Sequence, residues 1–217
     1  MERIQNIKDT EQNIEHIAEV LGIDRGCINY DEKEQVYLIS ALQELEKLEI
    51  KKEVNFSQLL NYPLKFIKCY FLQGLSVWKQ EFKENLIFDN VVFSKIINLS
   101  GNIFYRKVEF ANCKFEYFSM EKCSFEKEAI FTSCIFRDYT SFYEVNFNSK
   151  VNFCSTSFFE SVSFFKVNFL SPYTKEDIIN ILSSKKMKLQ AVFIETFNND
   201  FRYITANKSF SIQEATF

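Results

Sequence analysis

The chain has 217 residues, of which 47% are apolar, and this is enough to bury the core of one large domain or of one medium domain with attachments. Its formal net charge of −3 argues against a general binder of nucleic acid or of anionic membranes, because such proteins carry a basic surplus. The composition is unusual in having 26 Phe against 4 Gly and 2 Pro, which indicates a phenylalanine core with few glycine turns.

The first 53 residues are acidic, with 13 acidic and 7 basic side chains. They lack the apolar stretch of a signal peptide, so we expect a cytoplasmic protein whose six cysteines remain reduced. No part of the sequence approaches the roughly 20 continuous apolar residues of a membrane span. Apolar residues at helical spacing predict two helices, roughly 11 to 21 and 33 to 50. We therefore interpret residues 1–53 as a helical N-terminal region that caps the adjoining domain.

A repeat occupies residues 86–169. Large apolar residues recur there at mostly alternating steps of five and six, and the residue two positions before each is usually small or β-branched. Neither a helix nor a long flat strand has this spacing. The spacing is explained by a chain that places one small and one large side chain inward and then turns a corner. Four such units predict a four-sided coil of about 21 or 22 residues, and successive coils stack at about 4.8 Å.

This coil predicts four columns of core side chains. The columns are Phe93, Phe115, Phe136 and Phe158; Leu99, Met120, Phe142 and Phe164; Phe104, Phe125, Phe147 and Phe169; and Phe88, Phe110, Phe131 and Phe153. One irregularity is a step of five on both sides of Met120, where Phe118 takes a position normally held by a small residue. We expect a local bulge there.

The repeat resembles the pentapeptide-repeat family, in which a small residue, Asp or Asn, and Leu or Phe are followed by two polar residues. The best matches are Val145-Asn146-Phe147, Val151-Asn152-Phe153 and Val167-Asn168-Phe169. The resemblance implies a mainly β fold, a right-handed quadrilateral β-helix, over residues 54–170. It is regular over 86–170 and degenerate over 54–85, a segment that forms either one further coil or a capping element.

The repeat stops at Pro172. Residues 171–217 are predicted to form a partly helical C-terminal cap, with a short helix over 175–182 and helical spacing of Phe193, Phe197 and Phe201. Such a cap would cover the last coil, whose edge would otherwise be open. Association of two copies through an uncovered coil end is the second possibility.

Residues with catalytic chemistry are sparse. The single histidine, His16, is far in sequence from every cysteine except Cys27, so a Cys-His nucleophile or a histidine metal site is poorly supported. Cys113 and Cys134 fall one coil apart in one column and are expected to serve as small buried apolar residues, while Cys154 is expected to be exposed. Acidic and basic residues alternate along the repeat as a solvated surface does, and no glycine-rich phosphate loop is present. The sequence therefore predicts no enzyme, no cofactor and no metal.

Aromatic residues near the inward positions are candidates for an interaction surface, because aromatic side chains on a rigid rod favour protein binding. The candidates are Tyr105, Tyr117, Tyr139, Tyr143, Phe159 and Phe165. Packing at the corners of the coil is the alternative explanation of their positions.

These features predict a non-catalytic scaffold whose partner is another protein, with no direct nucleic-acid binding. Some members of the resembled family present an acidic rod to type II topoisomerases in imitation of DNA. That alternative is disfavoured because residues 86–170 carry nine acidic and nine basic side chains, without the negative surplus of a duplex. A third possibility, an enzymatic or effector activity in the flanking segments, has no motif in its support.

Overall fold

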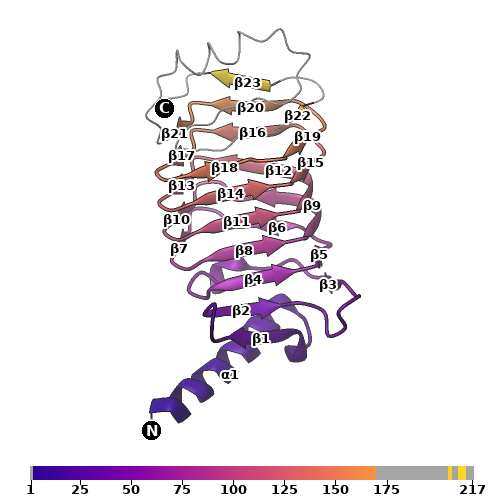
Figure 1. Ribbon diagram of the computed structural model, residues 1–217, viewed down its shortest axis with the longest axis vertical. Coiled ribbons are helices and arrows are strands. Elements are labelled where there is room, and N and C mark those ends of the chain that lie inside the picture. Colours follow the sequence, from indigo (N-terminus) through magenta and orange to yellow (C-terminus); the bar gives the residue numbers. More distant parts are fainter. Residues whose placement is uncertain (1, 170–204, 207–209, 214–217) are drawn as a thin grey trace.

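The chain folds into a β-solenoid of about six stacked turns with one N-terminal helix, and its computed structural model describes residues 2–169, 205–206 and 210–213 (Figure 1). Strands of successive coils pair in parallel and in register, so that Phe88, Phe110 and Phe131 are direct partners. The predicted β-helical fold of stacked coils is confirmed.

Four sides follow one another around each coil, and we number them in chain order. The strands of the first side are β2 (Val36–Ile39), β4 (Leu64–Ile67), β8 (Leu86–Asp89), β11 (Val108–Ala111), β14 (Ala129–Thr132) and β18 (Val151–Asn152). The second side has β3 (Leu48–Ile50), β5 (Cys69–Phe71), β15 (Ile135–Phe136) and β19 (Ser157–Phe158), and the third has β6 (Leu75–Ser76), β16 (Thr140–Tyr143) and β20 (Val162–Phe165). Two long strands, β9 (Val92–Asn98) and β12 (Lys114–Glu121), continue from the second side into the third. The fourth side has β7 (Glu81–Phe82), β10 (Ile103–Phe104), β13 (Ser124–Phe125), β17 (Asn146–Phe147) and β21 (Asn168–Phe169).

The predicted columns of phenylalanine rings form the core. On the second side the ring centroids of Phe93, Phe115, Phe136 and Phe158 are 5.3, 4.6 and 4.9 Å apart in succession, and the rings are stacked. Rings of adjacent sides meet edge to face, as Phe110 and Phe115 do at 5.5 Å and 70°. Each ring buries roughly 150 to 250 Å², and such pairs add about 0.5 to 1.5 kcal/mol beyond the buried area. Stacked aromatic side chains therefore supply the core that glycine-poor coils need.

The alternation of five-residue and six-residue steps has a backbone cause. Between Phe88 and Phe169 every step of five except that from Phe115 to Met120 turns through a residue with positive φ, such as Asn112 at 55° and Glu144 at 54°. The steps of six in the same segment turn without one. A left-handed residue shortens the corner by one position, and the two corner types alternate around the coil.

The predicted bulge at Phe118 is confirmed. Phe115 pairs with Phe93, but Tyr117 pairs with Ile96, so the preceding coil has one extra residue. Phe118 is buried, and its ring meets those of Phe115 and Phe136 edge to face at 5.0 Å each. The large ring therefore fills the interior at the corner between the second and third sides.

The degenerate segment 54–85 forms a true coil and not a cap. Its strands β4, β5, β6 and β7 pair with β8, β9 and β10 of the next coil. Phe66, Phe71 and Phe82 extend three of the columns, and Phe56, in the short helix η2 (Phe56–Gln58), is buried beside them.

The predicted helix over residues 33–50 is wrong, because this segment forms β2 and β3 of the first coil. Ile39 pairs with Phe66 and Ile50 with Phe71, which extends two core columns. Leu42 and Leu45, which completed the apparent helical spacing, lie exposed in the loop between the two strands. Pairing of the β-branched Ile39 and Ile50 with the next coil stabilises strands here, and it outweighs the helix that the local three-residue spacing favours. The solenoid therefore starts inside the region predicted to be helical.

The N-terminal end of the solenoid is capped by α1 (Glu2–Leu21), whose residues 11–21 fulfil the other helix prediction. Ile17, Val20 and Leu21 are buried against the first coil. The helix ends at Gly22 with φ of 65°, where the Ile23 backbone N–H donates to the Ala18 carbonyl at 3.1 Å, a pairing that caps helix C-termini.

Two short elements complete this end. The helix η1 (Arg25–Cys27) leads into β1 (Ile28–Asp31). This strand pairs antiparallel with β2 and forms the N-terminal edge of the sheet on the first side. At their turn, the backbone N–H groups of Glu34 and Lys33 donate to the Asp31 carboxylate and lower its pKa.

Beyond residue 170 the described structure consists of two strands. β22 (Thr205–Ala206) pairs in parallel with β19, and β23 (Phe210–Gln213) pairs in parallel with β20. The region predicted as a cap therefore contributes strands to the stack, whereas the helix predicted over 175–182 and the spacing of Phe193, Phe197 and Phe201 lie outside the described residues. Within the part of the chain that the structure describes, no helix is both long and apolar enough to cross a membrane.

Candidate functional site

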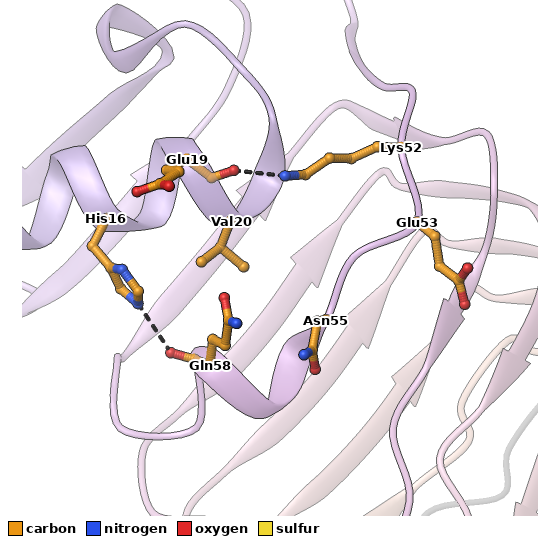
Figure 2. Close-up of a pocket in the computed structure, with 7 residues that line it drawn as sticks. All are labelled: His16, Glu19, Val20, Lys52, Glu53, Asn55 and Gln58. Atoms are coloured by element: carbon orange, nitrogen blue, oxygen red, sulfur yellow. Dashed lines mark hydrogen bonds between the residues drawn. The ribbon is translucent and has the colours of Figure 1, made fainter.

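A hollow of about 680 Å³ lies between α1 and the first coil, and Figure 2 shows the residues that line it. The Lys52 ammonium donates to the Glu19 carbonyl at 2.6 Å, at the C-terminal end of the helix where a cation is favourable. His16 Nε2 lies 3.4 Å from the Gln58 carbonyl, and its ring is 5.8 Å from that of Tyr62. These contacts join α1 to the coil.

The chemistry of this hollow is structural. The Asn55 side chain accepts from the Ser57 backbone N–H and so caps η2, and Glu53 lies across the hollow from His16 in Figure 2. The described residues that line it include no serine, threonine or cysteine that His16 could activate. Among the described residues, no group of three or more His, Cys, Asp and Glu side chains is arranged to hold a metal ion.

Five of the six cysteines are buried, as a structural role predicts, and Cys154 is half-buried. Cys113 and Cys134 occupy one column on the second side, and their thiols donate to the carbonyls of Phe88 and Phe110 in the preceding coil at 3.4 and 3.2 Å. Burial raises the pKa of Cys123 to about 11 and that of Cys69 to about 12. A buried thiol with a raised pKa is a poor nucleophile, because the thiolate is the reactive form.

Of the five exposed aromatic residues in the described structure, three lie on the outer surface of the third side, namely Trp78, Tyr117 and Tyr139. Side chains alternate along a strand, so the buried Thr140 and Phe142 place Tyr139, Ser141 and Tyr143 together on the outside. The same three positions recur in five successive coils. We name this surface the aromatic-bordered face, and its members are Gly74, Ser76 and Trp78; Ile96, Asn98 and Ser100; Tyr117, Ser119 and Glu121; Tyr139, Ser141 and Tyr143; and Ser161, Ser163 and Phe165.

Small polar residues run along the middle of this face, and six of its ten border positions hold a large apolar or aromatic residue. The other four are Gly74, which is buried, and Ser100, Glu121 and Ser161. The middle row is Ser76, Asn98, Ser119, Ser141 and Ser163, each in register with the next. On one border, Ile96, Tyr117 and Tyr139 are 51%, 53% and 54% exposed. On the other, the rings of Tyr143 and Phe165 stack at 5.6 Å.

The structure brings four of the six predicted interaction residues onto this face, namely Tyr117, Tyr139, Tyr143 and Phe165. Phe159 is half exposed just before the corner that leads to it, because it follows the inward Phe158 at the end of the second side. Tyr105 lies apart from them. It follows Phe104 at the end of the fourth side, at the corner diagonally opposite Tyr139.

Sequence reasoning missed Trp78 and Ile96, which also border the face. Trp78 is 60% exposed, and the Lys79 ammonium lies 4.1 Å from its ring centroid. A Cβ atom at Gly101 would lie 3.3 Å from the indole, so the glycine at this corner avoids a close contact with the Trp78 side chain. The repeat could have predicted both positions, because Trp78 lies two residues after Ser76 and Ile96 two residues before Asn98, and residues two apart on a strand share a face.

The aromatic-bordered face is nearly uncharged. Glu121 is its one ionisable acid, and the ion pairs of Glu144 with Lys122 and Lys166, at 3.9 and 3.7 Å, lie at the adjoining corner. Within the described structure the Tyr117 and Tyr139 hydroxyls have no hydrogen-bond partner. The face therefore offers aromatic rings and neutral hydroxyl groups, which suit an uncharged ligand better than nucleic acid.

No protein-family model, no curated protein and no solved structure matches this chain.

Proposed function

We propose that the protein is a non-catalytic scaffold of the pentapeptide-repeat type that binds another protein in the cytoplasm through its aromatic-bordered face. One observation carries the proposal: Trp78, Ile96, Tyr117 and Tyr139 are each more than half exposed and border a single side of a rigid rod. Exposed aromatic residues that gather on one surface are typical of protein contacts, and Trp and Tyr dominate their binding energy.

The thiols and His16 support a binding role over catalysis. The thiols of the core donate to backbone carbonyls, and the His16 ring lies against the Gln58 carbonyl. The parallel ladders also hold the face rigid, so little conformational entropy is lost when a partner binds. A preorganised surface without a reactive group favours recognition.

Imitation of DNA for a type II topoisomerase remains the weaker candidate. Nine acidic and nine basic residues alternate over residues 86–170, and several pair across coils, as Arg137 does with Glu116 at 3.4 Å. A duplex carries one negative charge per about 1.7 Å, and this surface has no such surplus. We expect no inhibition in a gyrase supercoiling assay, and potent inhibition would reverse the ranking.

Affinity capture from the source cells tests the proposal. The tagged wild-type chain is compared with the Tyr117→Ala/Tyr139→Ala double variant and with Tyr105→Ala, a matched control at the opposite corner. Because all three tyrosines are exposed, we expect unchanged unfolding midpoints. We also expect proteins retained by the wild type and by Tyr105→Ala to be depleted about tenfold with the double variant, as measured by quantitative mass spectrometry. Equal retention by all three chains, or retention of nothing, would contradict the proposal.

A further inference from the structure

The size of the aromatic-bordered face limits what it can hold. With coils about 4.8 Å apart and a rise of about 3.3 Å per residue, its five coils measure about 24 Å along the axis and about 13 Å across, and Val54 and β23 continue the third side by one coil at each end. The interface of a globular partner buries about 800 Å² on each side, which is well above this area. The face on its own therefore suits a single narrow chain that runs along the solenoid axis.

The backbone of the face is already paired, which excludes the addition of a strand. The Val77 N–H donates to the Asn98 carbonyl at 3.0 Å and the Leu99 N–H to the Ser119 carbonyl at 3.1 Å, and these bonds repeat from coil to coil. A peptide that adds a strand to a sheet needs an open edge. Recognition on this face has to use side chains.

The chemistry of the side chains excludes two other common modes of peptide recognition. An amphipathic helix needs an apolar floor, but the middle row here consists of Ser119, Ser141 and their polar equivalents. Phosphorylated or acidic segments need clustered arginines, and the face has none: its own charged residue is Glu121, and the Lys79 ammonium lies over the Trp78 ring. The mode that uses exposed aromatic rings, which this face does have, docks a proline-rich chain onto them.

We infer that the aromatic-bordered face binds a proline-rich segment in the polyproline II conformation, an inference that rests on the proposed function and names the part of the protein partner that is recognised. Polyproline II has three residues per turn and a rise of about 3.1 Å, so one turn of about 9.3 Å nearly equals two coils. Residues three apart in the segment can thus meet Ile96 and Tyr139, which lie two coils apart on the same border.

The contacts follow from the arrangement of the rings. Tyr139 and Tyr143 flank Ser141 on one coil, and Tyr117 lies one coil below on the same border. Proline rings pack on such exposed rings, and the Tyr117 and Tyr139 hydroxyls donate to the carbonyls of the segment, which polyproline II leaves without internal partners. Because a proline-rich segment has no charged side chains with which Glu121 or Lys79 could pair, binding depends little on salt.

Titration with a synthetic decaproline peptide tests the inference. Ten residues extend about 31 Å, which is enough to run over the four coil spacings from Phe165 to Trp78. Trp78 is the only tryptophan of the chain, so its fluorescence reports the occupied face directly. We expect saturable quenching or a blue shift, with a Kd that changes less than twofold between 50 and 500 mM salt.

Matched variants locate the binding. Tyr139→Ala is expected to raise the Kd for decaproline at least tenfold, whereas Tyr105→Ala, at the opposite corner, is expected to leave it unchanged. Absence of binding at millimolar peptide, an equal loss with Tyr105→Ala, or displacement of the peptide by a neutral oligosaccharide such as maltoheptaose would overturn the inference. If decaproline fails while captured proteins still depend on Tyr117 and Tyr139, the inference falls and the proposed protein-binding function stands. If neither binding depends on these residues, both fall.

Discussion

The small inward position of each repeat combines packing with hydrogen bonding. Cys113 and Cys134 donate their thiols to carbonyls of the coil below, and the Thr156 hydroxyl does the same to the Phe131 carbonyl. Asn102 is wholly buried and donates to the Val77 and Leu99 carbonyls at 3.0 and 2.7 Å. The residue at this position is therefore usually small, and where it is polar its donor meets a carbonyl of the backbone.

Burial of the thiols predicts a loss of stability at alkaline pH. The pKa of Cys123 is raised to about 11 by burial, so above about pH 9 the unfolded chain releases a thiol proton that the folded chain keeps. The contribution of this thiol to the free energy of unfolding is therefore fully present below about pH 9 and is lost as the pH rises toward 11. We expect Cys123 alone to account for about 1 to 2 kcal/mol of the loss between pH 8.5 and 10.5, as measured by urea unfolding.

A valine variant separates this thiol from the lysines and tyrosines that titrate in the same range. Val145 and Val167 are buried in the same column as Cys123, so the site accepts valine. Cys123→Val should lose less stability than the wild type over the same pH interval. Identical losses in the two proteins would contradict the assignment.

The corner is the element that decides the regularity of the coil. Asn90, Asn112, Ser133 and Ser155 recur at the corner between the first and second sides with φ between 54 and 60°. Non-glycine residues adopt this conformation at a cost of about 1 to 2 kcal/mol each, which is lowest for Asn. The stacked core therefore holds corners that the chain would not adopt in isolation.

A pair of substitutions at Ser133 tests the conformation of the corner. Ser133 is exposed with φ of 54°, so a β-branched side chain would be strained without any change in core packing. We expect Ser133→Val to lower the free energy of unfolding by about 1 to 3 kcal/mol and Ser133→Gly to change it by less than about 1 kcal/mol. Denaturant unfolding measures both, and equal effects would show that the corner is not left-handed.

Local spacing predicted the regular elements and failed where tertiary pairing decided. The columns from Phe88 to Phe169 follow from spacing alone, because each large residue has an equivalent in the next coil. Residues 36–50 contain no complete repeat, so the three-residue spacing of Val36, Ile39 and Leu42 imitated a helix. Only the register with Phe66 and Phe71, visible in the structure, makes these residues strands.

At the scale of the molecule, stacking in register turns a short strand motif into a continuous surface. The sequence identified four aromatic residues of the aromatic-bordered face, but it placed Tyr105 with them because it did not assign each residue to a side. It missed Trp78 because the degenerate coil that holds it had no certain register. Assigning every residue to a side and to an inward or outward position recovers the whole face.

A spin-label distance along this face tests most directly whether the coils stack in register. Labels at Ser76→Cys and Ser163→Cys, in a Cys154→Ser background with the other five cysteines buried, lie four coil spacings apart in one row. Double electron–electron resonance should give one narrow distribution centred at about 20 Å. A broad distribution, or one centred beyond about 30 Å, would contradict the stacked solenoid and the continuous binding face built on it.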